Sequence, residues 1–117
     1  MTVSLVGLTL HVSDVDRAVE FYRRLPDAAV VFHLPGCFAM LRLGEGRLGL
    51  LADQKRPFHV ELEVPDLEAA AADLQRLGFE IDGPTRRQWG EEDVLLVDPD
   101  GNLLEFAAPR PQSRKAP

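Results

Sequence analysis

Histidine, threonine and glutamate side chains alternate with apolar residues in two short segments of this 117-residue chain. In the later segment His59, Glu61 and Glu63 occupy every second position. In the earlier segment Thr9 and His11 are likewise two residues apart. Such alternation is typical of β-strands, in which side chains two residues apart point to the same face. Imidazole and carboxylate groups gathered on one face can bind a small molecule or exchange a proton with it.

The acidic residues of the later segment leave two interpretations open. Glu61 and Glu63 could recognise a cationic or hydroxyl-rich ligand, or they could simply be wetted where a sheet face meets another subunit. His11 could form a hydrogen bond with a ligand or with one of these glutamates. Trp89 could form an aromatic wall of the same site, or it could pack at the mouth of a hairpin. The candidate ligand-binding residues are Thr9, His11, His59, Glu61, Glu63 and Trp89.

Glu105 is a candidate catalytic residue because of its apolar surroundings. It alternates with Leu103 and Ala107 in a strand-like segment, so these three residues share one face. Burial of a carboxyl group among apolar side chains raises its pKa unless a partner compensates. A carboxyl group with a raised pKa is suited to act as an acid or a base.

The two polar segments begin two copies of one structural unit. Residues 6–25 and 58–77 align at a constant offset of 52 residues, from 59 − 7. Each copy has the pattern of a strand, a cap residue and an amphipathic helix. In the first copy Ser13 occupies the expected N-cap position. The alignment predicts that the chain contains the same unit twice.

Alternation also assigns the two faces of the first strand. Leu8, Leu10 and Val12 share the apolar face, which the helices should cover. Thr9 and His11 lie on the opposite face. The pattern therefore predicts a polar, wettable concavity on the side of the sheet that carries no helix.

Further strand-like segments follow the helix in each copy. In the first copy they are residues 28–34, 37–43 and 47–52. In the second copy they are an extended region at 79–88 that Gly83-Pro84 interrupts, followed by 93–97 and 102–107. The sequence therefore predicts an α+β fold in which two tandem βαβββ modules form a cupped mixed sheet with helices on its outer face.

The expected modules span residues 1–52 and 58–108, which together make one domain. A polar segment that ends in proline, residues 53–57, is the predicted linker between them. Residues 109–117 are rich in proline and basic residues, so we expect a disordered tail there.

The composition limits the classes of partner. A net charge of −6 argues against a nucleic-acid or anionic-membrane partner, because proteins that bind such surfaces normally carry a basic patch. A small molecule is the expected partner. Cys37 is the single cysteine, which excludes an intramolecular disulfide and fits a reducing cytoplasm. No apolar run approaches the roughly 20 residues that span a bilayer. We therefore expect a cytoplasmic protein.

Two phrases make the duplicated unit recognisable. VSDVDRAVEFYRRL begins at Val12 and VDPDGNLLEF begins at Val97. In this order and inside a duplicated frame, they closely resemble the vicinal oxygen chelate superfamily, which includes glyoxalase I, extradiol dioxygenases and bleomycin-resistance proteins. The resemblance covers residues 3–107 and implies the fold. It implies the chemistry less specifically, because the same frame hosts both enzymes and pure binding proteins.

The resemblance also implies where a divalent metal would bind. In metal-using members the ligands come from the first and the last strand of each module. The matching positions are Gly7 and His59 on the first strands, and Gly49 and Glu105 on the last strands. Glycine supplies no ligand, so the set is incomplete and implies at most a weakly bound metal. His11 lies four residues from Gly7, roughly 13 Å along a strand, and cannot simply replace the missing ligand.

Three functions follow from the resemblance. The first, which the missing ligands at Gly7 and Gly49 favour over the two alternatives, is a bleomycin-resistance-like protein that binds a small organic molecule without a tightly held catalytic metal. The second is a metal-dependent lyase, isomerase or dioxygenase of the glyoxalase type that uses His59 and Glu105. The third is a metal-free enzyme in which Glu105 or Glu61 acts as the base, or in which a His59–Glu105 pair transfers the proton. Whether the protein is an enzyme stays open at this point.

The resemblance implies a homodimer as well, because small members of the superfamily usually dimerise. The exposed edges of the predicted sheet could be covered by pairing one module against the other module of a second subunit. We therefore expect a C2 homodimer.

Overall fold

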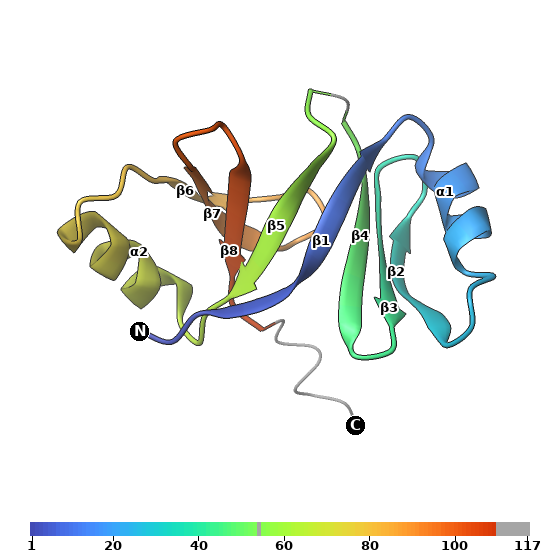
Figure 1. Cartoon of the computed structure of the whole chain (residues 1–117), viewed down its shortest axis with the longest axis horizontal. Helices are drawn as coiled ribbons and strands as arrows, with labels where there is room; N and C mark the ends of the chain where they lie inside the picture. The colour runs from blue at the N-terminus through green and yellow to red at the C-terminus, as the bar shows by residue number, and fades with distance from the viewer. Residues whose placement is uncertain (54, 110–117) are drawn as a thin grey trace. The chain divides into compact units, whose positions relative to one another are not determined.

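The computed structural model describes residues 1–53 and 55–109 of the chain. These residues form eight strands and two helices (Figure 1). One strand, one helix and three strands occur twice in succession, which confirms the predicted α+β fold of two βαβββ modules. In chain order the elements are β1 (Ser4–Val12), α1 (Val15–Tyr22), β2 (Ala28–Leu34), β3 (Phe38–Leu43), β4 (Gly46–Ala52), β5 (Phe58–Glu63), α2 (Leu67–Arg76), β6 (Asp82–Arg86), β7 (Glu92–Val97) and β8 (Leu103–Ala107).

The strands form a mixed sheet, as predicted, with the hydrogen-bonding order β2-β3-β4-β1-β5-β8-β7-β6. In the first module β3 pairs antiparallel with β2 and with β4, and β1 pairs parallel with β4. In the second module β7 pairs antiparallel with β6 and with β8. The chain divides into two compact units, one formed by Val6–Val60 and the other by Met1–Leu5 together with the residues from Glu61 onward.

Each module has its own hydrophobic core beneath its helix. In the first module α1 contacts β3 and β4, and in the second α2 contacts β6 and β7. The apolar faces of the two helices therefore anchor them to the strands. The buried core residues are Val15, Val19, Ala39, Leu41 and Leu50 in the first module, and Val64, Leu67, Ala70, Ala71, Leu74, Val94, Leu96 and Phe106 in the second.

The prediction for the apolar face of β1 is confirmed for two of its three residues. Leu10 and Val12 pack against the core of the first module. The prediction is wrong for Leu8, whose side chain is 40% exposed. The eight residues of α1 make a helix about 12 Å long. The nine residues of β1 extend for about 30 Å, so this helix is too short to cover the whole strand.

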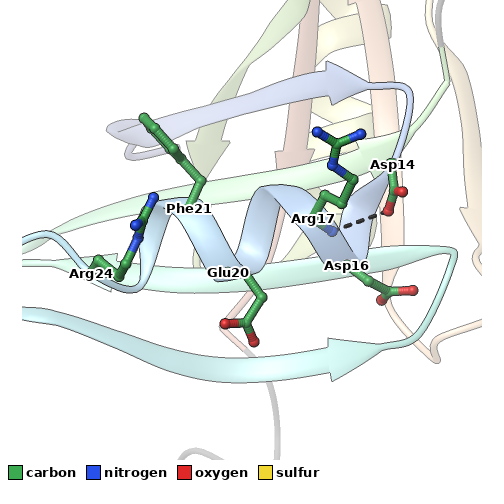
Figure 2. A pocket seen from close by; sticks show the side chains of 6 residues that line it. All are labelled: Asp14, Asp16, Arg17, Glu20, Phe21 and Arg24. Carbon is green, nitrogen blue, oxygen red and sulfur yellow. Dashed lines mark hydrogen bonds between the residues drawn. The ribbon is translucent and has the colours of Figure 1, made fainter.

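The N-cap of α1 is Asp14, not Ser13 as the sequence suggested. Asp14 has an extended backbone, with φ −142° and ψ 101°, and its Oδ1 accepts a hydrogen bond from the Arg17 N–H at 3.0 Å (Figure 2). Asp66 caps α2 in the same way and accepts from the Ala69 N–H at 3.1 Å. A carboxylate also interacts favourably with the positive end of the helix dipole, which a serine hydroxyl does much more weakly.

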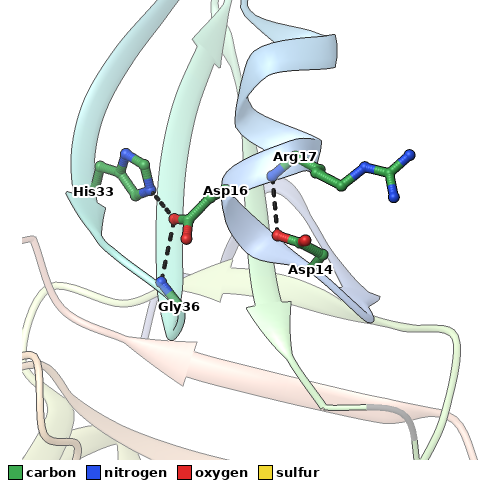
Figure 3. Close-up of polar contacts among 5 residues, drawn as sticks. All are labelled: Asp14, Asp16, Arg17, His33 and Gly36. Carbon is green, nitrogen blue, oxygen red and sulfur yellow. Dashed lines mark hydrogen bonds and ion pairs between the residues drawn. The ribbon is translucent and has the colours of Figure 1, made fainter.

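Asp16, in the first turn of α1, ties this helix to the β2–β3 turn. Its Oδ1 lies 2.7 Å from His33 Nε2 and accepts a hydrogen bond from the Gly36 N–H at 3.1 Å (Figure 3). The hydrogen bond to His33 is the main cause that lowers the pKa of Asp16, and the Gly36 N–H adds to it. The predicted turn at Pro35-Gly36 is thus held by the helix that precedes it in the chain.

The second module differs from the prediction in its first strand after the helix. We expected Gly83-Pro84 to interrupt the extended region, but β6 runs from Asp82 to Arg86 and includes both residues. The register with β7 shifts between Asp82 and Thr85, and this irregularity accommodates the proline, which has no N–H to donate to the ladder.

Two regions of the prediction fall on residues that the structure does not describe. The expected tail at 109–117 lies outside the described residues from 110 onward, and residue 54 of the expected linker does as well. In the described ranges, no helix is long and apolar enough to cross a membrane.

Candidate functional site

Two glutamates of the second module form the centre of the candidate site. Glu61 lies on β5 and Glu105 on β8, and one oxygen of each lies within 4.8 Å of the other. The two strands run side by side here, because the Val64 N–H donates to the Ala107 carbonyl oxygen at 3.0 Å. Glu61 is 6% exposed. The structure therefore brings together two carboxyl groups that are 44 residues apart in the sequence, from 105 − 61.

His59 precedes Glu61 by two residues on β5, so its side chain lies on the same face of this strand. It is also 6% exposed. In the part of the chain that the structure describes, His59, Glu61 and Glu105 are the group of histidine and carboxylate side chains that could hold a metal ion. The sequence predicts His59 and Glu105 as metal ligands and Glu61 as a ligand-binding residue. The structure adds Glu61 as a third potential ligand.

Glu105 has an unusually high pKa. Burial is the largest cause, and a hydrogen bond with the Asp93 side chain and the negative charges of Glu91 and Glu61 raise the pKa further, to about 10. The apolar flanks of Glu105 predicted this direction from the sequence. They did not predict the crowding of carboxylates, which comes from residues on β5, on β7 and in the loop before β7.

Asp93 was not recognised in the sequence as a site residue. It begins the apolar run of β7, is 0% exposed, and lies on the same sheet face as Leu95, which is the register partner of Glu105. Arg87 holds it with two hydrogen bonds, Nε to Oδ2 at 2.8 Å and Nη2 to Oδ1 at 2.7 Å. One signal in the sequence could have pointed to Asp93. It is an acidic residue near the start of an apolar strand, and it follows the arginine Arg87 by six positions.

Trp89 is connected to the site indirectly, by a hydrogen bond to Glu91. Its Nε1–H donates to Glu91 Oε1 at 3.2 Å, and both residues lie in the loop between β6 and β7. The Arg87 N–H donates to the Glu91 carbonyl at 2.7 Å and closes this loop. Because the charge of Glu91 acts on Glu105, the tryptophan holds one of the groups that set the pKa of Glu105.

His11 contacts His59 rather than a glutamate. His11 Nε2 lies 2.8 Å from His59 Nδ1, and the two rings meet edge to face with their centroids 5.0 Å apart and an interplanar angle of 73°. Burial is the main cause that lowers the pKa of His11, opposed by the negative charge of Asp53 and reinforced by the positive charge of Arg56. From the sequence, a ligand or a glutamate is the expected partner of His11, whereas the structure pairs it with a histidine.

The family follows from the comparison with known proteins. The family model described as a glyoxalase-like domain matches residues 7–107. The chain belongs to this family. The resemblance seen in the two sequence phrases is thereby confirmed. No curated protein matches the chain.

Solved structures of other proteins share the glyoxalase-like fold. A glyoxalase/bleomycin resistance protein/dioxygenase superfamily member from Vibrio splendidus is 17% identical, with a TM-score of 0.63, and the match covers 92% of this chain and 98% of that one. Methylmalonyl-CoA epimerase from Mycobacterium tuberculosis is 21% identical, with a TM-score of 0.70 and coverage of 95% and 91%. A variant of the Streptomyces coelicolor methylmalonyl-CoA epimerase in complex with 2-nitronate-propionyl-CoA is 25% identical, with a TM-score of 0.70 and coverage of 89% and 95%.

The side chains on the polar face of this glyoxalase-like domain are less exposed to solvent than the sequence suggested. Thr9 is 0% exposed, and His59 and Glu61 are nearly as buried. Glu63, at the end of β5, is partly buried. The predicted wettable concavity is wrong for these first three residues. For His59 and Glu61 the reason is that the polar side chains cover one another: His59 contacts His11, and Glu61 lies beside Glu105.

Gly7 occupies a position where the glyoxalase-like domain has no room for a side chain. Gly7 is the register partner of Arg47 on β4, and a Cβ added to it would lie 2.1 Å from the Arg47 carbonyl oxygen. That contact is with backbone and cannot be relieved by a rotamer change. Gly49 is buried on β4 opposite Thr9. The first module therefore supplies no ligand at either of the two positions that the resemblance implied.

A separate groove lies on the outer face of α1 in the first module. Figure 2 shows its side chains projecting from this helix and its N-terminal flank. The Arg24 guanidinium lies 5.6 Å from the centre of the exposed Phe21 ring. None of the predicted site residues lines this groove, whose lining is Asp14, Asp16, Arg17, Glu20, Phe21 and Arg24.

Proposed function

We propose that this glyoxalase-like protein is a divalent-metal-dependent enzyme that transfers a proton at a carbon next to a carbonyl group of a small organic substrate. The observation that carries the proposal is the crowding around Glu105. Burial is the largest cause that raises the pKa of its carboxyl group, and Asp93, Glu91 and Glu61 raise it further, to about 10. Crowded buried carboxylates are costly unless protons or a cation neutralise them, and His59 stands beside them on β5.

The side chains present fit a divalent ion. One imidazole nitrogen and two carboxylates, from His59, Glu61 and Glu105, are a donor set that suits zinc, iron or manganese. Three protein ligands that leave further positions open are typical of catalytic rather than structural metal sites. A cation at this place would also oppose the carboxylate charges that raise the pKa of Glu105. Glu61 thus compensates for one of the two ligands that Gly7 and Gly49 do not supply.

The bound ion would act as a Lewis acid that polarises a substrate oxygen and makes the neighbouring C–H more acidic. Glu105 is the residue that we assign to accept the proton, because its carboxylate has two oxygens: one would help to hold the ion, and the other would take the proton. Asp93 shares a hydrogen bond with Glu105 and therefore stabilises the protonated form that this transfer produces. Arg87 keeps Asp93 in place through its two hydrogen bonds.

For the substrate class we propose an acyl-coenzyme A thioester or a related organic acid. Support comes from the epimerase structures with the same fold, one of which holds 2-nitronate-propionyl-CoA. Epimerisation of such a thioester removes a proton next to a carbonyl group and adds a proton to the opposite face of the same carbon. The removal step matches the chemistry assigned to Glu105. At these identities the support is an analogy of fold.

The test is exchange of the substrate α-proton with solvent. Metal-loaded protein is incubated with methylmalonyl-CoA in D₂O, and deuterium incorporation is followed by mass spectrometry. We expect incorporation with wild type, a loss of at least roughly 100-fold in Glu105→Gln, and no change in Glu45→Gln, whose side chain lies in an exposed turn. Wild-type exchange that survives chelation of all metal would contradict the role of the ion and favour the metal-free acid–base enzyme.

A second candidate function is a binding protein without a tightly held catalytic metal. One observation favours it: Gly7 has no room for a ligand side chain. In this function Thr9, His11, Glu63 and Trp89 would serve to bind a small organic molecule rather than to support a reaction. Thermal-shift screening that finds a tight ligand, with no metal and no proton exchange, would support this candidate against the enzyme.

We further propose that the protein is a C2 homodimer located in the cytoplasm. The edge strands β2 and β6 could pair with a second copy, and the cysteine Cys37 is not in a disulfide. Sedimentation velocity tests the dimer, with a monomeric mass as the contradicting result. Cell fractionation tests the location.

A further inference from the structure

We infer that His11 is a positioning residue: it accepts a hydrogen bond from His59 Nδ1–H and so leaves His59 Nε2 without a proton, ready to bind the ion. This inference rests on the function proposed above and deepens it. Its geometric basis is the 2.8 Å distance between His11 Nε2 and His59 Nδ1. Both residues belong to the compact unit formed by Val6–Val60.

A single proton lies between these two nitrogens, so the pair has two arrangements when both rings are neutral. In one, His59 Nδ1–H donates to His11 Nε2, and the other nitrogen of His59 keeps its lone pair. In the other, His11 Nε2–H donates to His59 Nδ1, and His59 Nε2 then carries the proton. A protonated nitrogen cannot be a metal ligand, so the first arrangement alone allows His59 to bind an ion through Nε2.

His59 cannot use its other nitrogen for the ion without losing this contact, because Nδ1 is already engaged by His11. The edge-to-face contact of the two rings also restricts rotation of the His59 ring. Metal-binding histidines usually donate their second N–H to a fixed acceptor, which sets the tautomer and the direction of the ring. His11 has the position and the chemistry of such an acceptor.

The second ring nitrogen of His11, Nδ1, is consistent with the role of His11 as the hydrogen-bond acceptor for His59. In the described part of the chain, His11 Nδ1 is buried and has no hydrogen-bond partner. In the proposed arrangement this nitrogen carries the second proton of the pair. A buried N–H with no partner in the protein needs a ligand atom or a water molecule as acceptor, so His11 Nδ1 is also a candidate contact for a polar group of the substrate.

The first experiment measures Zn²⁺ affinity by competition with a chromophoric chelator. His11→Phe keeps an aromatic ring but removes the acceptor, whereas His11→Gln keeps an acceptor oxygen at a similar distance from the backbone. We expect affinity to fall roughly 10- to 100-fold in His11→Phe and to recover largely in His11→Gln. His33→Phe is the matched control, because His33 contacts Asp16 and not His59, and its affinity should equal that of wild type.

The second experiment reads the tautomer directly, by long-range ¹H–¹⁵N correlation spectra of the histidine rings. The inference predicts a protonated Nδ1 and an unprotonated Nε2 for His59, in the metal-free protein as well as with Zn²⁺. A proton on His59 Nε2 in the metal-free protein, or unchanged Zn²⁺ affinity in a folded His11→Phe variant, would overturn it. If wild type binds no ion, the proposed function fails by itself, and the metal-free spectrum still decides the role of His11.

Discussion

Arg87 and Asp93 form a two-point ion pair, with Nε 2.8 Å from Oδ2 and Nη2 2.7 Å from Oδ1. Asp93 is completely buried, and its hydrogen bond to Arg87 is the main cause that raises the pKa of Arg87, with its negative charge adding to the effect. The same carboxylate shares a hydrogen bond with Glu105. The pair therefore connects the stability of the second module to the protonation of the residue assigned as the catalytic base.

Replacing Arg87 by glutamine should destabilise the protein. The change leaves the buried Asp93 without its two charged hydrogen bonds, and hydrogen bonds to charged groups contribute roughly 1.5–3 kcal/mol. The free energy of unfolding, measured by urea titration, should fall by about 2–3 kcal/mol. Arg86→Gln is the control, because Arg86 is exposed and lies 3.9 Å from Glu92, and surface pairs of this kind contribute little. Equal stabilities of the two variants would contradict the structural role of Arg87.

The stability of the metal-free protein should fall as the pH rises through the neutral range. The pKa of Glu105 is about 10 in the folded protein against 4.5 as its ordinary value, so the folded state holds this proton more tightly than the unfolded state does. The resulting stabilisation is fully present below about pH 4.5 and is lost as the pH approaches 10. Glu105→Gln, which mimics the protonated carboxyl group, should flatten this part of the profile, measured by urea unfolding in the presence of a chelator. A wild-type profile that already matches that of Glu105→Gln would show that Glu105 is ionised in the folded protein.

The contact of Asp16 with His33 and Gly36 should stabilise the first module at neutral pH but not in acid. The pKa of Asp16 is lowered from 3.8, so its contribution is present above about pH 3.8 and is lost as the pH falls through the folded-state value. Asp16→Asn should therefore be less stable than wild type at pH 7, and the difference should shrink as the pH falls below 3.8 through the lowered folded-state pKa of Asp16. Thermal unfolding at several pH values measures this, with Asp100→Asn in an exposed turn as the control. A difference that stays constant with pH would rule out a charge-dependent contact.

Gly7→Ala should be strongly destabilising, because the new Cβ would lie 2.1 Å from the Arg47 carbonyl oxygen. Separating β1 from β4 to relieve this contact should cost about 3 kcal/mol. Gly46→Ala, in the same strand pair, is the matched control: its Cβ would lie 3.6 Å from the nearest atom, the Leu43 carbonyl oxygen. Urea unfolding measures both variants. A stable Gly7→Ala protein would mean that a ligand side chain could stand at this position after all.

The fold was accessible from the sequence because the chain repeats itself. Two strand–helix units are recognisable in the sequence because they repeat at an offset of 52 residues. The two N-cap residues, Asp14 and Asp66, are separated by the same offset. The cap was still assigned one residue early, since Ser13 and Asp14 both suit the position and only the backbone dihedral angles decide between them. Gly78 has φ 97° and follows α2, as expected for the residue after a helix end.

The candidate site was accessible only in part. His59 and Glu105 came from the duplicated frame, and the alternation along β5 put Glu61 on the face of His59. Asp93 could not be found in this way, because its link to Glu105 depends on the pairing of β7 with β8, and its link to Arg87 on the conformation of a loop. The His11–His59 contact was likewise missed, because it joins residues 48 positions apart, and the sequence analysis considered only glutamates and a ligand as partners of His11.

The central claim, that His59, Glu61 and Glu105 hold a divalent ion, is tested most directly by metal analysis and calorimetric titration. Elemental analysis of protein purified without added metal is followed by titration of metal-free protein with Zn²⁺, Ni²⁺, Mn²⁺ and Fe²⁺. We predict close to one ion per chain for wild type and for the exposed control Glu45→Ala, and loss of binding in His59→Ala, Glu61→Ala and Glu105→Ala. No ion above background in folded wild-type protein, or undiminished binding in the three site variants, would contradict the claim.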